Sequence, residues 1–162
     1  MKHYLISICL LLSACASLPP AFDNVPVTDM AYNQVREDLD DYHNTIVRWG
    51  GVIVSVENIE NISLMEITHY PLDHYGRPQL DETSEGRFVI KSAALLDPKI
   101  YAAEREIIVL GVIDGEIERT TNNETRILLP LINATAIHLW PINYQGNYFS
   151  HCPSCYFKQL FW

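Results

Sequence analysis

Alternating apolar and polar positions divide the middle of the chain into short extended segments. The stretch 47–56 carries β-branched residues on both faces and two adjacent glycines, Gly50 and Gly51, which is typical of a strand that bends or admits a close backbone. Residues 57–61 are expected to turn the chain into a second strand over 62–70, which Pro71 ends. A third short strand is expected over 86–92.

The second half of the chain continues this extended pattern. Residues 107–113 form the most apolar run outside the N-terminal segment, which predicts a central strand covered on both sides. Asp114 and Gly115 are expected to turn this strand, and one or two closing strands interrupted at Pro130 are expected over 126–140. Between the strands, 72–85 is a long polar loop, and loops of this length tend to carry function or mobility.

Helical signals are few. A short helix is predicted over 29–36 with Thr28 as its cap, and 95–98 predicts a helical or extended turn. Five or six strands of uneven length without alternating long helices favour an all-β fold, a small five- to six-stranded OB-like barrel with one or two short helices. The arrangement expected for such a barrel has a short helix after the third strand. A β-sandwich is the alternative.

The N-terminus changes the domain organisation. The chain begins with a short basic region, followed by an apolar run that is too short to span a bilayer. The run ends in the sequence Leu-Ser-Ala-Cys at 12–15, which resembles the lipobox of bacterial lipoproteins. Cleavage before Cys15 would leave diacylglycerol on its thiol and an acyl chain on its amine, and Ala16 favours the outer membrane by analogy. The alternative is a plain secretory signal with Cys15 buried or in a disulfide. The expected organisation is a signal peptide (1–14), a lipidated tether (15–28), a barrel domain (29–140) and an aromatic tail (141–162).

Charge narrows the class of partner. The formal net charge is −9, with 20 acidic and 11 basic residues, and this balance repels phosphate backbones, so no nucleic-acid partner is expected. The acidic run 37–41 lacks the spacing of an EF-hand loop and is expected to be a solvated face. We predict no metal site and no cofactor apart from the covalent lipid at Cys15.

The residues that could carry chemistry are scattered. Cys152 and Cys155 form a Cys-x-x-Cys pair close to the C-terminus, outside the strand–helix context of a redox motif, which favours a local disulfide over redox or metal chemistry with His151. His69, His74 and His138 lie on separate segments, and His138 is expected to pack within the sheet. No catalytic residue is predicted.

A second set of residues suggests a weak binding site. Arg48, Trp49, Arg87 and Tyr101 form a candidate ligand patch, in which the arginines would recognise a carboxylate or phosphate. The alternative is a structural role, in which the arginines form ordinary ion pairs and cation–π contacts and Trp49 packs in the core or at its rim. If the patch binds, Arg48, Arg87 and the 72–85 loop would lie at the mouth of a barrel that takes a small anion or a lipid.

Several short motifs occur together in one order, and with them the chain resembles the Slp family of outer-membrane lipoproteins of Gram-negative bacteria. They are the lipobox at Cys15, Val-Arg-Trp-Gly-Gly-Val-Ile at 47–53, Pro-Leu-Asp at 71–73 leading to Gly-Arg-Pro at 76–78, Glu-Gly-Arg-Phe at 85–88, Leu-Asp-Pro at 96–98 with Tyr101, Val-Leu-Gly at 109–111 and His-Leu-Trp at 138–140. The tail that holds Cys152 and Cys155 departs from this pattern.

The resemblance implies a lipid-anchored β-barrel domain linked to starvation and stress, with no enzymatic activity established. We therefore expect a non-enzymatic binding or structural module of the envelope, held at the outer membrane by its lipid and facing the periplasm. Its expected partners are the membrane and other envelope proteins. The alternatives are a periplasmic redox or metal-binding protein that uses Cys152 and Cys155, and the small-anion or lipid-binding barrel.

Overall fold

Five strands make up most of the described chain. The computed structural model describes residue 22, residues 30–120 and residues 125–142. The strands are β1 (Ile46–Ile59), β2 (Ile62–Tyr70), β3 (Gly86–Ser92), β4 (Glu106–Thr120) and β5 (Arg126–Leu139). The bounds of β2 and β3 agree with the sequence prediction.

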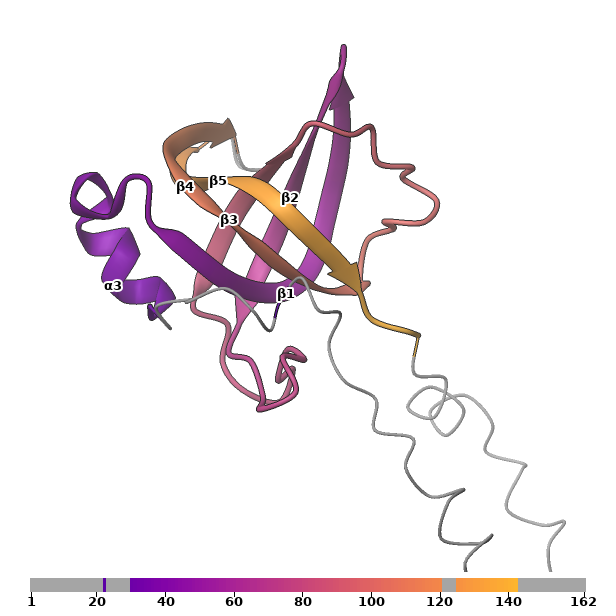
Figure 1. Cartoon of the computed structure of the whole chain (residues 1–162), viewed down its shortest axis with the longest axis horizontal. Coiled ribbons are helices and arrows are strands. Elements are labelled where there is room, and N and C mark those ends of the chain that lie inside the picture. Colours follow the sequence, from indigo (N-terminus) through magenta and orange to yellow (C-terminus); the bar gives the residue numbers. More distant parts are fainter. Residues whose placement is uncertain (1–21, 23–29, 121–124, 143–162) are drawn as a thin grey trace, which may run out of the picture.

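The strands close into a barrel in the order β1-β2-β3-β5-β4, with β4 returning to β1 (Figure 1). β3 and β5 run parallel, and the other neighbouring strands run antiparallel. This confirms the predicted OB-like barrel. β1 makes closure possible because the positions from Gly50 to Val52 pair with β2 on one side and with β4 on the other.

The glycine pair of β1 is required by a close backbone contact. A Cβ atom at Gly51 would lie 1.8 Å from the carbonyl oxygen of Thr68 on β2, and one at Gly50 would lie 2.8 Å from the carbonyl oxygen of Ile107 on β4. Real Cβ atoms do not approach backbone so closely, so both neighbouring strands would have to shift. The close backbone approach predicted for the glycine pair is confirmed, and it occurs on both sides of β1.

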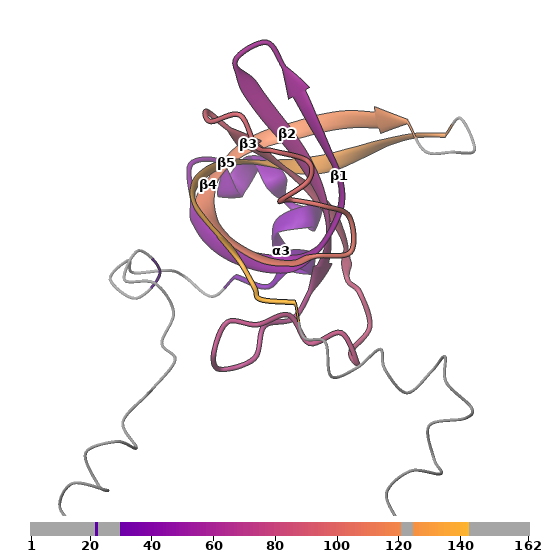
Figure 2. The same ribbon diagram turned by 90° about the vertical axis from the view of Figure 1, so that its right-hand side faces the viewer.

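A short helix covers one end of the barrel. Helix α3 (Tyr32–Glu37) and the 3₁₀ turn η1 (Leu39–Tyr42) precede β1, and Figure 2 shows α3 within the outline of the barrel. Tyr32 and Val35 of α3 are buried in the core. The helix starts later than predicted, with Ala31 rather than Thr28 at its N-cap and no side-chain cap, so packing holds it in place. Both helical segments precede β1, whereas residues 93–105, after the third strand, form bends and turns.

Side chains fill the interior of the barrel. The core combines inward positions of every strand, with Trp49, Met65, Phe88, Val109 and Ile132 among its members, each exposed by 3% or less. A ligand held inside the barrel, as the small-anion or lipid-binding alternative required, would have to displace this core. Any ligand site therefore lies on the outside or at an end.

Two strands continue well past the ends that the sequence predicts. β1 continues to Ile59, so the β1–β2 turn is only Glu60 and Asn61, with Glu60 in the left-handed region at φ 50°. β4 does not turn at Asp114–Gly115 but continues to Thr120, and a shift in register between Ile113 and Gly115 absorbs this pair as a bulge.

β5 is one unbroken strand that passes through Pro130. Pro130 pairs with Glu116 of β4, and pairing with β3 begins one residue later, at Leu131. Pro130 thus occupies the last position at which β5 is an edge strand, where a missing backbone N–H costs little.

Candidate binding site at the barrel end

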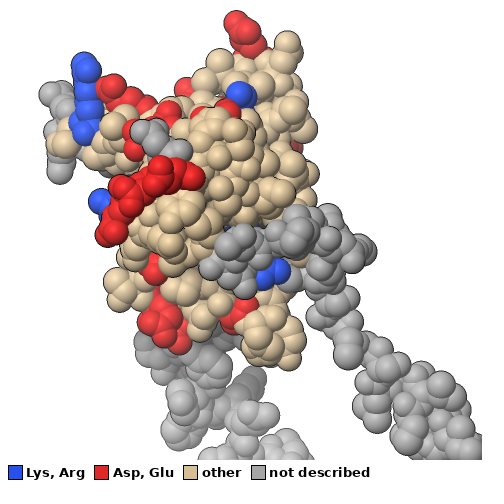
Figure 3. Space-filling view, turned by 60° about the vertical axis from the view of Figure 1, so that its left-hand side comes forward, with Lys and Arg blue, Asp and Glu red and all other residues tan. Residues whose placement is uncertain are grey.

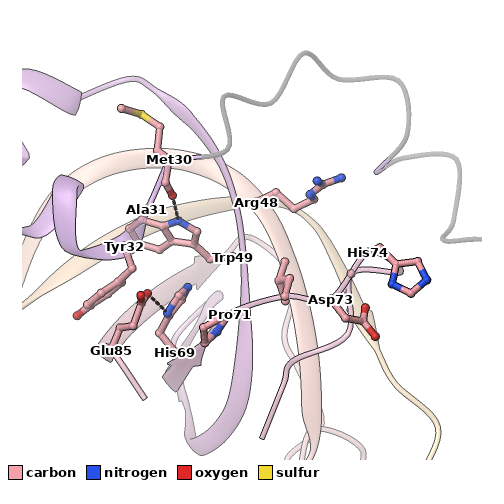
Figure 4. Close-up of a pocket in the computed structure, with 12 residues that line it drawn as sticks. Met30, Ala31, Tyr32, Arg48, Trp49, His69, Pro71, Asp73, His74 and Glu85 are labelled. Atoms are coloured by element: carbon pink, nitrogen blue, oxygen red, sulfur yellow. Dashed lines mark hydrogen bonds and ion pairs between the residues drawn. The ribbon is translucent and has the colours of Figure 1, made fainter. Parts of the chain in front are cut away.

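A pocket of about 480 Å³ opens where the starts of α3 and β1 and the end of β2 meet. The 71–76 part of the long loop forms its other wall, and Figure 4 shows the side chains that line it. Arg48 and Trp49 come from β1, His69 from β2, and Glu85 from the residue before β3. The strand pairing that closes the barrel therefore also brings these residues together.

Interlocking rings form the floor of the pocket. The His69 ring stacks on Tyr32 with centroids 4.8 Å apart, and Trp49 meets both rings edge-on at 5.7 Å and 5.2 Å. Trp49 Nε1 donates a hydrogen bond to the carbonyl oxygen of Met30, and the Tyr32 hydroxyl donates one to the carbonyl oxygen of Arg87. These bonds join the segment before β1 to β1 and β3, so the floor is rigid.

His69 is the buried titratable group of this floor. Its Nδ1 lies 3.1 Å from Oε2 of Glu85, and only 5% of the residue is exposed. Burial lowers the pKa of His69 from 6.5 to about 4, because removal from water disfavours the charged imidazolium. The imidazole is therefore neutral at neutral pH. Burial also raises the pKa of the Tyr32 hydroxyl.

The loop wall of the pocket is fixed by its own carboxylate. Asp73 Oδ1 accepts hydrogen bonds from the backbone N–H groups of Tyr75 and Arg77, both at 2.8 Å. The Arg77 side chain then pairs with Glu106 at the start of β4, with Nη2 3.0 Å from Oε1, and this hydrogen bonding raises the pKa of Arg77. The long loop is thus pinned to the barrel at its base rather than loosely attached.

The structure brings together half of the predicted ligand patch. Arg48 and Trp49 line the pocket, and Trp49 is also a core residue, as the alternative interpretation expected. Arg87 pairs instead with Glu66 of β2 at 2.9 Å. Tyr101 packs against the core from the segment between β3 and β4.

Sequence reasoning missed His69, Glu85 and Tyr32 as members of one site. One signal could have identified His69, because Met65, Ile67 and His69 occupy alternating positions on β2, and the first two are fully buried. A histidine that continues an inward-facing apolar series is a buried polar group and requires explanation. The positions of Glu85 and Tyr32 depend on loop and helix packing that has no periodic signal.

The other predicted site residues lie apart from the pocket or beyond the described part of the chain. His138 packs on the outer wall of the barrel, 5.0 Å from the Trp140 ring, in line with the packing role expected for it. Cys15, Cys152 and Cys155 lie outside the described residues. Within residues 30–120 and 125–142 there is no cluster of three or more His, Cys, Asp or Glu side chains that could hold a metal ion. None of the helices in these ranges is long and apolar enough to cross a bilayer.

Acidic side chains dominate the charge on the face that Figure 3 shows. They form several separate patches, whereas basic side chains are scattered singly among them. This distribution reflects the net charge of −9.

The sequence has relatives among known proteins. The chain is 29% identical over 138 residues to outer membrane protein Slp of Escherichia coli, a match that covers 84% of this chain and 72% of that protein. It is 32% identical over 117 residues to the uncharacterized lipoprotein YeaY of the same organism, covering 68% of this chain and 60% of YeaY. A small single-stranded DNA-binding protein from Streptomyces coelicolor aligns with a TM-score of 0.39 and 12% identity over 60% of this chain and 94% of its own.

The family model for the outer membrane lipoprotein Slp family matches residues 12–162, nearly the whole chain. This match begins within the predicted signal peptide and includes the lipobox, the barrel and the C-terminal tail. It confirms the family predicted from the ordered motifs and the location at the outer membrane. The chain therefore belongs to the outer membrane lipoprotein Slp family.

Proposed function

We propose that this protein is a non-enzymatic binding module of the cell envelope, anchored to the outer membrane by lipid on Cys15 and facing the periplasm. The anchor follows from the lipobox, which the family model includes within its match. Two or more acyl chains, at about 0.8 kcal/mol for each buried methylene, hold a protein on a membrane almost permanently. The barrel is then a rigid body presented at the membrane surface.

The observation that carries the binding function is the pocket at the barrel end. Its floor is preorganised, because Trp49, His69 and Tyr32 are each at least nine-tenths buried and contact one another through their rings. Preorganisation lowers the cost of ordering a site when a ligand binds. Of the groups that could do acid–base chemistry, the Tyr32 hydroxyl is already bonded to a backbone carbonyl, and the neutral imidazole of His69 is only 5% exposed. This arrangement favours binding over catalysis.

Cell fractionation tests the anchor. Cys15→Ala should move the protein from the membrane to the soluble periplasmic fraction, because the thiol is the site of diacylglycerol attachment. The matched control is Ser13→Ala, which changes the signal region and keeps the cysteine. Retention of Cys15→Ala in the membrane fraction would contradict lipid anchoring.

Photo-crosslinking in intact cells tests the pocket. A photoreactive amino acid in place of His74, an exposed pocket residue, should form an adduct whose mass identifies what the pocket holds. The control position is Leu128, which is 62% exposed on β5, away from the pocket. The same adducts at both positions would count against a specific site at the barrel end.

A further inference from the structure

The chain is fixed to the barrel wall close to the predicted lipid. Phe22 is seven residues after Cys15 and only 2% exposed. It packs against Ile108 and Leu110 of β4, with Trp140 at the edge of the same cluster. Its ring also meets that of His138 edge-on, with centroids 6.5 Å apart. The tether expected over 15–28 is therefore interrupted by a contact with the outer wall.

This contact limits how the barrel can sit on a membrane. Seven residues span at most about 25 Å even when fully extended. A domain of about 100 residues, with a radius of gyration of about 13 Å, is wider than this. If Cys15 carries lipid, as proposed above, the link cannot pass around the barrel, and the wall that holds Phe22 must face the leaflet.

The surface next to Phe22 exposes large apolar side chains among charged ones. Trp140 lines a second hollow, of about 650 Å³, together with Leu80 and Ile142. Leu80 is 48% exposed and Ile142 is 50% exposed. The Arg77 guanidinium lies 5.8 Å from the centre of the Trp140 ring. Asp73, Asp81, Glu104 and Glu106 also line this hollow, and Arg77 is paired with Glu106. The features that suit the level of lipid headgroups are therefore Trp140 and the two exposed aliphatic side chains beside it.

The hairpins lie at the other side of the barrel. In Figure 1 the β1–β2 hairpin rises above the barrel, while the loop between β2 and β3 hangs below it and β5 ends at the lower right. Ile59 at the end of β1 and Leu128 near the start of β5 are 42% and 62% exposed, comparable with Leu80 and Ile142. The chain thus offers matched apolar positions on the two sides.

We propose that the short link from Cys15 to Phe22 holds the Trp140 face, defined as Leu72, Leu80, Trp140 and Ile142, against the lipid leaflet that carries the anchor. The β1–β2 and β4–β5 hairpins then point away from the membrane. The occupant of the Trp140 face is the lipid surface itself, because the length of the link leaves no room for a folded partner protein between them.

Fluorescence quenching on vesicles tests this orientation. The full-length lipidated protein is placed in vesicles of phosphatidylethanolamine and phosphatidylglycerol that contain brominated acyl chains. An environment-sensitive fluorescent amino acid replaces Leu80 or Ile142, and Ile59 or Leu128 in the controls. We expect severalfold stronger quenching at the first two positions. Equal quenching at all four, or stronger quenching at the hairpins, would overturn the orientation.

Flotation of the same samples separates this inference from the anchor. Protein that floats with the vesicles but shows no contrast between positions would overturn the orientation alone. Protein that does not float would overturn the lipid anchor, and the orientation with it.

Variants of Phe22 test whether the docked link sets the orientation. Phe22→Ser should undock the chain and abolish the contrast in quenching while flotation and the circular dichroism spectrum stay unchanged. Phe22→Leu retains an apolar side chain and should preserve the contrast. A contrast that survives Phe22→Ser would overturn the role of the link.

Discussion

At the scale of single residues, His69 is a titratable side chain held away from water, with 5% of the residue exposed. It closes an inward-facing series on β2, stacks on Tyr32 and contacts Glu85 through Nδ1. The rings of Tyr32, Trp49 and Phe88 surround its imidazole. Burial holds the pKa of His69 at about 4. Protonation of His69 by acid therefore costs free energy, because its buried surroundings disfavour the charged imidazolium.

This cost predicts a dependence of stability on pH. Because the pKa of His69 is about 4 in the folded state and about 6.5 when unfolded, the unfolded chain binds an additional proton between these values. The contribution of a neutral His69 to stability is therefore complete above pH 6.5 and is lost as pH falls toward about 4. The loss amounts to about 3 kcal/mol.

Urea denaturation at a series of pH values measures this contribution. His69→Phe keeps a ring in the stack but cannot titrate, so its free energy of unfolding should fall less than that of the wild type over this pH interval. The comparison uses the slope with pH, because the absolute stability of His69→Phe also reflects the lost contact with Glu85. Parallel profiles for the two proteins would show that His69 is not the titrating group.

At the scale of elements, β1 is the strand on which closure depends, and its glycines permit that closure. Gly51→Ala would place a Cβ atom 1.8 Å from the Thr68 carbonyl oxygen, and backbone on a paired strand cannot move aside as a flexible side chain can. We expect a loss of at least about 3 kcal/mol in the free energy of unfolding, the upper range for overpacking.

Gly115→Ala on β4 provides the contrast for Gly51→Ala. A Cβ atom there meets nothing within 4 Å, but the backbone φ of 117° is unfavourable for a side chain. Its expected cost is strain of about 1–3 kcal/mol, without a clash. Denaturant titration of both variants measures the two effects, and a Gly51→Ala protein as stable as the wild type would refute the close contact.

The strands also show what the sequence could and could not predict. β2 and β3 were predicted to the residue because proline, glycine or a polar loop bounds each of them. Local signals at Asp114–Gly115 and Pro130 favour a turn and a strand end, so the sequence predicts breaks there. Pairing with a neighbouring strand overrode those signals, through a bulge at Gly115 and an edge position at Pro130. A single sequence does not contain the identity of the paired strand.

The same limit applies to the candidate site. Arg48 and Trp49 could be identified because an arginine beside a tryptophan in a strand is a local feature. Glu85 joins them only because β3 lies next to β2 in the closed barrel, with Gly86 opposite His69. Arg87, two residues further on, points to Glu66 instead. The register of strand pairing thus determines which residues line the pocket, and it places residues two apart in the sequence in different surroundings.

At the scale of the whole molecule, residues 115–120 of β4 and 126–130 of β5 form a two-stranded ribbon that projects from the barrel. The ribbon and the barrel differ in how many neighbouring strands pair with them. Residues 107–112 of β4 pair with β1 and β5, whereas residues 115–120 pair with β5 alone. The ribbon is held to the barrel by a small cluster in which Leu129 packs with Leu64 and Val89, and by an ion pair between Arg119 and Glu57 at 3.1 Å. An exposed ion pair of this kind contributes less than about 1 kcal/mol.

The difference in support predicts two levels of hydrogen exchange. Amides of 116–120 and 126–129 should exchange at least about tenfold faster than those of 107–112, because the ribbon can open without breaking the barrel. Leu129→Ala should widen the gap by removing the apolar contact with β2 and β3, while Leu128→Ala, at a position 62% exposed, should leave it unchanged. Exchange followed by NMR measures both. The prediction is contradicted if amides of the ribbon and the barrel exchange at one rate and Leu129→Ala changes both rates together. The ribbon and the barrel would then open as one cooperative unit, and the ribbon would be as rigid as the barrel.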